Sequence, residues 1–175
     1  MVGSMKKESI EIKFRKANKD DLQNVFHIIQ LAIQDMNNKD IYQWDEIYPD
    51  KRTLLQDINK NELYIGFVAD KLVCAFVMNE ECNKDYNNGK WEGKDLTFKI
   101  IHRLCVNPEF QNKGIGTATV NYIEEQVKSK NGKSIRLDVF SKNPQAIHLY
   151  EKSGYKKVGE TDWRKGRFYL MEKIL

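Results

Sequence analysis

The sequence predicts a single α/β domain built on one mixed sheet, which is mostly antiparallel and has one parallel pairing. Three observations predict this fold class. Apolar stretches of strand length alternate with stretches whose apolar residues recur at helical spacing. Two strand-like stretches on either side of Asp70-Lys71 have the pattern of a hairpin. A strand–helix–strand segment follows at residues 96–140, and such a crossover makes its two strands parallel.

The first half of the chain is predicted to form a strand, two helices and the two hairpin strands. Ile10–Arg15 alternates between apolar and polar residues, as a half-buried strand does. Asp20–Gln23 has a capping-box pattern ahead of apolar residues at helical spacing, and Pro49-Asp50 opens a second helix. The hairpin strands are expected at Leu63–Ala69 and Leu72–Met78.

The second half is predicted to contain a loop, two helices and four strands. The polar stretch Glu80–Gly93 is the loop, and Leu96–Val106 is a long apolar strand that ends before Pro108. Asn143 and Pro144 are a favourable N-cap and first residue for a helix. The other expected elements are a helix from about Gly114 to Lys130, a strand at Ile135–Phe140, a helix from Pro144 to about Ser153, and strands at Tyr155–Val158 and Phe168–Ile174.

Composition indicates a soluble globular protein. Hydrophobic residues make up 41% and charged residues 31% of the 175 positions. No apolar run approaches the length of a membrane span, and Met1–Met5 lacks the apolar core of a signal peptide. We therefore expect a cytoplasmic protein without a membrane partner. Residues 1–9 are interpreted as a tag remnant or disordered start, and residues 10–175 as the domain.

The cysteines and charges narrow the ligand classes. The three cysteines lack the spacing of a disulfide framework, and no Cys/His cluster has zinc spacing, so no metal is expected. Residues 128–175 hold 12 Lys and Arg against 5 Asp and Glu, whereas residues 35–95 hold 8 against 13. A basic half suits a polyphosphate ligand and an acidic half a cationic one, although ordinary solvated faces would give the same balance. The chain has no motif of a nucleic-acid binder.

A glycine-containing loop joins the long apolar strand to the next helix. The loop reads Gln111-Asn-Lys-Gly114-Ile-Gly116. Glycines allow a sharp turn, and the free N–H groups at a helix start attract a phosphate. Asp138 lies 22 residues after Gly116, as a dinucleotide-binding fingerprint requires, but Thr119 stands at the third glycine position and the strand is too far from the glycines. A nucleotide-dependent oxidoreductase is therefore disfavoured.

A second motif lies on the following helix. It reads Asn143-x-x-Ala146-x-x-x-Tyr150 and is followed by Gly154-Tyr155. Asn143 and Tyr150 are seven residues apart and share one helix face. Together the two motifs and the element order resemble the GNAT superfamily of acyl-CoA-dependent N-acyltransferases, and in particular a bacterial, small-molecule type. The motifs cover about fifty residues, and the element order covers nearly the whole chain.

The resemblance implies a GNAT-like fold and acetyl-CoA as co-substrate. It places the pyrophosphate on the backbone amides from Asn112 to Thr117, and pairs pantetheine with the backbones of Leu104 and Val106. The residues expected to bind coenzyme A are Leu104, Cys105, Val106, Gln111, Asn112, Lys113, Gly114, Ile115, Gly116, Thr117, Asn143, Ala146 and Tyr150. Asn143 also fits a plain helix N-cap.

Acetyl transfer needs a proton donor for the leaving thiolate and a base for the attacking amine. Tyr150 is the expected donor, with a buried packing role as its alternative. A backbone N–H near Val106 would stabilise the oxyanion. Glu80, directly or through water, and His102 are the candidate bases, and Arg103 and Glu92 are further options. His102 is expected to share a strand face with Ile100 and Leu104, where a histidine is often only a core residue.

Four aromatic residues are expected to line the acceptor pocket, because the family builds that pocket from the same segments. They are Tyr42, Trp44, Tyr48 and Trp91. Aromatic faces beside acidic residues suit an organic cation, although each ring would serve equally well in packing. The partner is therefore expected to be a small-molecule or peptide amine, and the protein a monomer or homodimer.

The expected function is direct transfer of acetyl from acetyl-CoA to a primary amine in a ternary complex. No cysteine stands where the family would place a nucleophile, so an acyl-enzyme is not favoured. The alternative is a non-catalytic acyl-CoA-binding sensor or a protein-interaction domain, which would bind coenzyme A without turnover.

Overall fold

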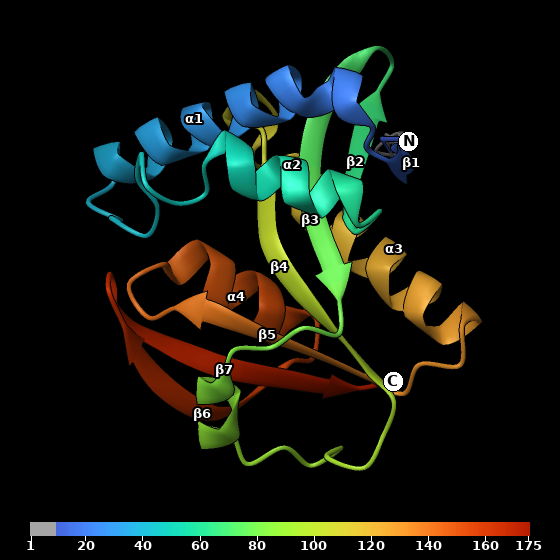
Figure 1. Cartoon of the computed structure of the whole chain (residues 1–175), viewed down its shortest axis with the longest axis vertical. Coiled ribbons are helices and arrows are strands. Elements are labelled where there is room, and N and C mark those ends of the chain that lie inside the picture. The colour runs from blue at the N-terminus through green and yellow to red at the C-terminus, as the bar shows by residue number, and fades with distance from the viewer. Residues whose placement is uncertain (1–9) are drawn as a thin grey trace, which may run out of the picture.

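The computed structural model describes residues 10–175, so the expected tag remnant or disordered start at residues 1–9 lies outside the described part. The element order is the predicted one (Figure 1). The elements are β1 (Lys13–Lys16), α1 (Leu22–Asn38), α2 (Lys51–Asn59), β2 (Leu63–Val68), β3 (Lys71–Asn79), β4 (Phe98–Val106), α3 (Ile115–Ser129), β5 (Ser134–Phe140), α4 (Pro144–Lys152), β6 (Lys156–Trp163) and β7 (Gly166–Ile174), with short 3₁₀ turns η1 (Lys19–Asp21), η2 (Lys84–Asn88) and η3 (Pro108–Phe110).

The strands form one mixed sheet in the order β1-β2-β3-β4-β5-β7-β6. The pairing of β4 with β5 is parallel, and the other five pairings are antiparallel. The parallel pair is joined through α3, as the strand–helix–strand segment predicted. The predicted fold class, an α/β domain with a mixed sheet, is therefore confirmed.

Helices cover both faces of the sheet. α1 and α2 pack side by side over β2, β3 and β4, and their core includes Leu54, Ile65, Val77 and Cys105 (Figure 1). α3 and α4 contribute to a second core on the opposite face, which includes Ile101, Ile123, Leu137 and Tyr150. Side chains alternate between the two faces along each strand, so neighbouring residues of a strand pack into different cores.

β4 and β5 separate before either strand ends. Their last paired residues are Ile101 and Leu137, but β4 continues to Val106 and β5 to Phe140. β3 still holds β4 through Val106, and β7 holds β5 through Phe140. The sheet therefore contains a rigid-walled gap between residues 102–106 of β4 and residues 138–140 of β5.

A β-bulge lies in β4 beside this gap. His102 is opposite Val77 and Cys105 is opposite Ala75. Two residues of β4, Arg103 and Leu104, therefore lie opposite the single β3 residue Phe76. Arg103 has a positive φ of 49°. The extra residue reverses the parity of β4, so His102 lies on the α1–α2 face while Leu104 packs in the core of α3 and α4. The expectation that His102 and Leu104 share a face is therefore wrong.

The start of α1 also differs from the expectation. The capping box is formed by Asn18 and Asp21 around η1, and not by Asp20 and Gln23. The Asn18 side chain accepts from the Asp20 N–H at 2.9 Å, and the Asp21 carboxylate accepts from the Asn18 N–H at 2.8 Å. The 3₁₀ turn precedes the helix, so the cap lies earlier than helical periodicity alone indicates.

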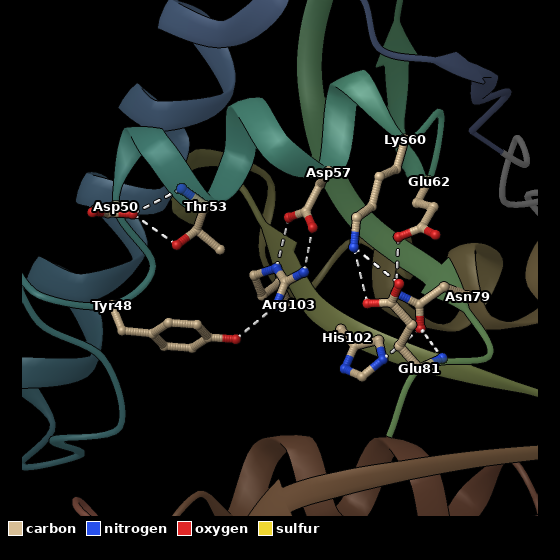
Figure 2. Close-up of polar contacts among 10 residues, drawn as sticks. All are labelled: Tyr48, Asp50, Thr53, Asp57, Lys60, Glu62, Asn79, Glu81, His102 and Arg103. Carbon is tan, nitrogen blue, oxygen red and sulfur yellow. Dashed lines mark hydrogen bonds and ion pairs between the residues drawn. The ribbon is translucent and has the colours of Figure 1, made fainter. Parts of the chain in front are cut away.

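A buried ion pair ties the bulge to α2. The Arg103 guanidinium donates from Nε and Nη2 to the two carboxylate oxygens of Asp57 at 2.9 and 2.6 Å, and from Nη1 to the Tyr48 hydroxyl at 2.8 Å (Figure 2). The two charged side chains are only 12% and 8% exposed. Burial raises the Asp57 pKa, and the attraction of Arg103 opposes this effect. The pair fixes the bulge and the α1–α2 loop in one arrangement.

Asp57→Ala should lower the free energy of unfolding by about 3 kcal/mol, because it leaves the Arg103 charge buried without its partner. Adding Arg103→Met should recover most of that loss, since the double variant has no buried charge to solvate. Urea unfolding measures both effects. Asp162→Ala, which breaks an exposed pair with Arg167, is the control and should leave the midpoint unchanged. Equal destabilisation by the single and double variants would contradict this role.

Candidate active site

The gap opens into a cavity of about 860 Å³. Its walls come from α1, the α1–α2 loop, η2, β4, the glycine loop, β5, α4 and the β6–β7 turn. One continuous space therefore joins the glycine loop, at the α3 end, to the polar side chains on the α1–α2 face.

The glycine loop presents free backbone donors to this cavity. Gly114 is the N-cap of α3 with a φ of 80°, and no side chain caps the helix. The Ala118 N–H is bonded to the Gly114 carbonyl at 3.0 Å, so the N–H groups of Ile115, Gly116 and Thr117 precede the helical ladder. A Cβ at Gly116 would lie 3.2 Å from the Leu149 side chain, because α3 approaches α4 closely here. The loop can hold an anion.

Two side chains of the loop have defined places. Gln111 donates from Nε2 to Asp35 on α1 at 3.1 Å and accepts from Lys39 at 3.3 Å, which holds the loop against α1. Asn112 lines the cavity with a positive φ of 60°. Lys113 is outside the cavity lining, and its ammonium lies over the Phe110 ring at 5.1 Å.

The backbone of β4 also points donors and acceptors into the gap. The Asn107 N–H donates to the Val73 carbonyl of β3 at 2.8 Å. Because backbone groups alternate in direction along a strand, the groups of Cys105 also face β3, and those of Leu104 and Val106 face the gap. The Cys105 thiol is buried and donates to the Ile28 carbonyl at 3.7 Å, and burial raises its pKa. It is therefore a poor nucleophile.

Helix α4 brings Asn143, Ala146 and Tyr150 to the cavity. The Asn143 side chain caps the helix by accepting from the Ala146 N–H at 3.1 Å, and it donates to Gln43 of the α1–α2 loop at 3.0 Å. Tyr150 is 6% exposed and lines the cavity. Burial and the nearby Asp138 carboxylate raise the Tyr150 pKa, so the hydroxyl keeps its proton.

His102 faces the cavity from the other side of the sheet. Its Nε2 lies 2.8 Å from Oδ1 of Asn79, whose amide nitrogen donates to Glu62 at 2.9 Å (Figure 2). Asn79 Oδ1 is an acceptor, so Nε2 carries the proton and Nδ1 has a free lone pair. Burial and the adjacent Arg103 charge lower the His102 pKa to about 4. The ring is therefore neutral at pH 7.

Asp138 is a site residue that the sequence interpretation missed. It lies on β5 one residue beyond the last β4–β5 pair, and it lines the cavity. Its Oδ2 accepts from the Tyr86 hydroxyl of η2 at 2.7 Å. Burial raises the Asp138 pKa, against the opposing effects of Tyr86 and Arg103. The available signal was a single carboxylate within the apolar strand Ile135–Phe140.

The other predicted residues divide into two groups. Trp44 and Tyr48 line the cavity. Tyr42 is 53% exposed and outside the lining, and Trp91 stacks on Tyr86 with ring centroids 5.5 Å apart. The Glu80 side chain is 65% exposed, pairs with Lys99 and does not line the cavity. The structure therefore gathers two of the four aromatic residues at the cavity, and of the two candidate bases only His102.

Neither a membrane-spanning helix nor a metal centre is found in the described part. No helix of residues 10–175 is both long and apolar enough to cross a bilayer. Over the same residues, no three His, Cys, Asp or Glu side chains are grouped as metal ligands.

Comparison with known proteins gives consistent matches. The model of the family described as "Acetyltransferase (GNAT) family" matches residues 20–155. S-(2-succino)cysteine N-acetyltransferase of Bacillus subtilis is 22% identical over 92% of this chain and 94% of its own length. Spermidine N(1)-acetyltransferase of Thermoplasma acidophilum is 25% identical over 94% of this chain and 98% of its own length. An uncharacterised N-acetyltransferase of Methanocaldococcus jannaschii is 32% identical over 63% of this chain, but this chain spans only 41% of that protein.

Solved structures agree with the fold. A GNAT-family acetyltransferase of Streptococcus agalactiae has a TM-score of 0.81 at 20% identity, covering 94% of this chain and 95% of that one. The PaiA N-acetyltransferase of Thermoplasma acidophilum, solved in complex with coenzyme A, has a TM-score of 0.70 at 20% identity, covering 94% and 99%.

The low pKa of His102 should make folding stability depend on pH. An unfolded histidine binds a proton at its ordinary pKa of about 6.5, whereas folded His102 binds it only near pH 4. Stability should therefore fall by about 2 kcal/mol between pH 7 and pH 5 on account of this residue. His102→Gln keeps a donor for Asn79 and should remove that part of the loss, as urea unfolding at the two pH values would measure. His27→Gln on the exposed face of α1 is the control. An unchanged pH dependence in His102→Gln would contradict the assignment.

Proposed function

This chain belongs to the GNAT family of acetyltransferases, and we propose that it transfers acetyl from acetyl-CoA directly to a small primary amine. The family uses acetyl-CoA as the acetyl donor, and the N-acetyltransferase relatives support an enzyme rather than a non-catalytic sensor. The acceptor class and the direct mechanism are the parts that we infer from the site.

The observation that carries the proposal is the continuity of the cavity. It extends from the glycine loop, through the gap between β4 and β5, to Tyr48 and Asp138 on the α1–α2 face. Two ligands that enter from opposite ends would meet in the gap, so both substrates can be bound when the reaction occurs. This arrangement favours direct attack in a ternary complex.

The two buried cysteines support the same mechanism, and the exposed Cys82 does not line the cavity. Cys74 is fully buried and its pKa is raised to about 11, because burial disfavours the thiolate. Burial acts in the same direction on Cys105, as described above. An acyl-enzyme would need a reactive thiolate, and neither of these buried thiols supplies one at neutral pH.

Acetyl-CoA would lie with its pyrophosphate on the N–H groups of Ile115, Gly116 and Thr117, where the helix dipole favours negative charge. Its pantetheine would extend through the gap and pair with the backbones of Leu104 and Val106. The thioester carbonyl would then lie near the Val106 N–H, which would stabilise the oxyanion that forms on attack.

Tyr150 is proposed as the acid. The neutral amine attacks the thioester carbonyl, the C–N bond forms, and the C–S bond then breaks. The departing sulfur takes the Tyr150 hydroxyl proton, which the raised pKa keeps in place until a strong base develops beside it. Tyr150 recovers a proton from solvent at the end of the cycle.

Primary amines are proposed as acceptors because the named substrates of two relatives share that group. Spermidine is cationic, whereas S-(2-succino)cysteine carries several carboxylates. The rest of the acceptor therefore differs widely among relatives, and the reacting nitrogen is the common feature.

Wild-type protein with acetyl-CoA and a panel of primary amines should release coenzyme A, detected as free thiol. The panel would hold spermidine, S-(2-succino)cysteine, lysine analogues and peptides, with matched alcohols as controls. Gly116→Asp should abolish turnover, because its carboxylate would clash with Leu149 and repel the pyrophosphate. Acetyl-CoA at about 100 times its Kd should stabilise the wild type by about 2.7 kcal/mol, and this variant hardly at all. Absence of acetyl-CoA binding by the wild type would contradict the proposal.

Tyr150→Phe should lower kcat by about 100-fold or more and leave the Kd of acetyl-CoA nearly unchanged, because only the proton donor is removed. Steady-state kinetics and calorimetry measure the two quantities. Tyr122→Phe on α3, outside the cavity lining, is a matched control that should keep wild-type kcat. If kcat of Tyr150→Phe equals that of the wild type, Tyr150 has a packing role only.

A further inference from the structure

We propose that the Asp138 carboxylate binds the ammonium group of the acceptor and accepts its proton, and that Tyr86 positions this carboxylate. This inference rests on the proposed acetyl transfer to an amine and deepens it by naming the group that recognises the reacting nitrogen.

Asp138 lies where an incoming amine must arrive. It is the first residue of β5 beyond the parallel pairing with β4, so it borders the gap directly. The adjacent residues Leu137 and Val139 pack in the core of α3 and α4, so alternation places Asp138 on the opposite face. Tyr150 reaches the cavity from the α4 side, and Asp138 from the α1–α2 side. A thioester in the gap would thus have its acid and base on different sides.

The carboxylate is held in a fixed orientation. The Tyr86 hydroxyl donates to Oδ2 at 2.7 Å, and Tyr86 is itself buried. Trp91 stacks on the Tyr86 ring and donates from Nε1 to the Tyr86 carbonyl at 2.7 Å. Trp163 of β6 donates from Nε1 to Asp85 at 2.8 Å, which fastens η2 to the sheet. The loop therefore serves as a rigid support for one carboxylate.

Three of the four Lys and Arg side chains that line the cavity are paired with carboxylates, and the fourth, Lys152 on α4, is exposed. Arg103 is engaged by Asp57 and Tyr48. Arg164 and Lys165 of the β6–β7 turn both pair with Asp45.

Only two carboxylates line the cavity among the described residues, Asp35 and Asp138. Asp35 is bonded to Gln111 and Lys39 beside the glycine loop. In residues 10–175 no side chain occupies the second oxygen of Asp138. It is therefore the carboxylate free to receive an ammonium group.

The surroundings of Asp138 suit a base. Burial raises its pKa, while the Tyr86 hydrogen bond and the Arg103 charge lower it, and burial dominates. His148 on α4 also lines the cavity, as do His102 on β4, Tyr48 on the α1–α2 loop and Tyr150 on α4. His102 is neutral at pH 7, and Tyr48 and Tyr150 keep their protons, so these three side chains supply no competing negative charge.

The proton balance of the step is complete. The ammonium gives one proton to the Asp138 carboxylate, which releases it to solvent. The neutral nitrogen forms the C–N bond, and the resulting N–H⁺ of the tetrahedral intermediate gives its extra proton to the same carboxylate, which releases this second proton to solvent as well. The C–S bond breaks and the sulfur takes the Tyr150 proton, which solvent replaces. The net products are the amide, coenzyme A and one released proton.

The test uses the amine that the wild type acetylates fastest in the panel above. Asp138→Asn should lower kcat/KM by about 100-fold or more, remove the acidic limb of kcat/KM that Asp138 sets, and leave the Kd of acetyl-CoA unchanged. Tyr86→Phe removes a bond that lowers the Asp138 pKa, so the acidic limb of kcat/KM should move to higher pH. A purely structural role would not move that limb. Asp162→Asn on the surface of β6 is the control and should match the wild type.

The outcomes separate the two proposals. If the wild type acetylates the amine and Asp138→Asn has the same kcat/KM and the same acidic limb of kcat/KM as the wild type, the role of Asp138 is overturned. The proposed acetyl transfer would still stand. A Tyr86→Phe profile identical to the wild type overturns the positioning role. If the wild type transfers acetyl to no amine of the panel, the proposed function is overturned, and the assignment of Asp138 is overturned with it.

Discussion

The separation of β4 from β5 after Ile101 and Leu137 is the constraint on which the rest of the site depends. A parallel pair that stays bonded to its end offers no room for a ligand backbone. Here β3 holds β4 and β7 holds β5 through their last residues, so the gap between them keeps its shape. The free backbone groups of β4 and the free N–H groups of α3 border the same cavity. The extended part of a cofactor and its phosphates can thus be bound by backbone alone.

The bulge at Arg103 gives this gap two chemically different sides. Without the extra residue, Leu104 would face α1 and α2, and Cys105 would face α3. With it, His102 and Arg103 both reach the α1–α2 face. The Arg103–Asp57 pair satisfies the guanidinium charge internally, so the bulge is held without adding a free cation to the cavity. Among residues 10–175, the α1–α2 side of the gap then has the Asp138 carboxylate, and the α4 side has the protonated Tyr150 hydroxyl.

Much of this molecule could be predicted from sequence because it follows from local patterns. Helical spacing, the hairpin around Asp70-Lys71 and the glycine loop specify elements that the structure contains at nearly the expected residues. The bulge was not predictable, since the apolar run Leu96–Val106 has no alternation in which an extra residue would be visible. The positions of Glu80, Trp91 and Asp138 depend on how the loop 80–97 folds over β5, which is a long-range contact. In the sequence, Asp138 stands out only by its dinucleotide-fingerprint spacing from Gly116, and that spacing does not place it beside the gap.

The most direct test of this account is amide hydrogen exchange of β4, resolved by residue in NMR, with and without acetyl-CoA. The account predicts that the Leu104 and Val106 amides exchange quickly in the free protein, because they face the gap, and become protected when the cofactor binds. The Cys105 amide, which faces β3, should be protected in both states. Binding of acetyl-CoA without added protection at Leu104 and Val106 would contradict the claim that the cofactor occupies the gap between β4 and β5.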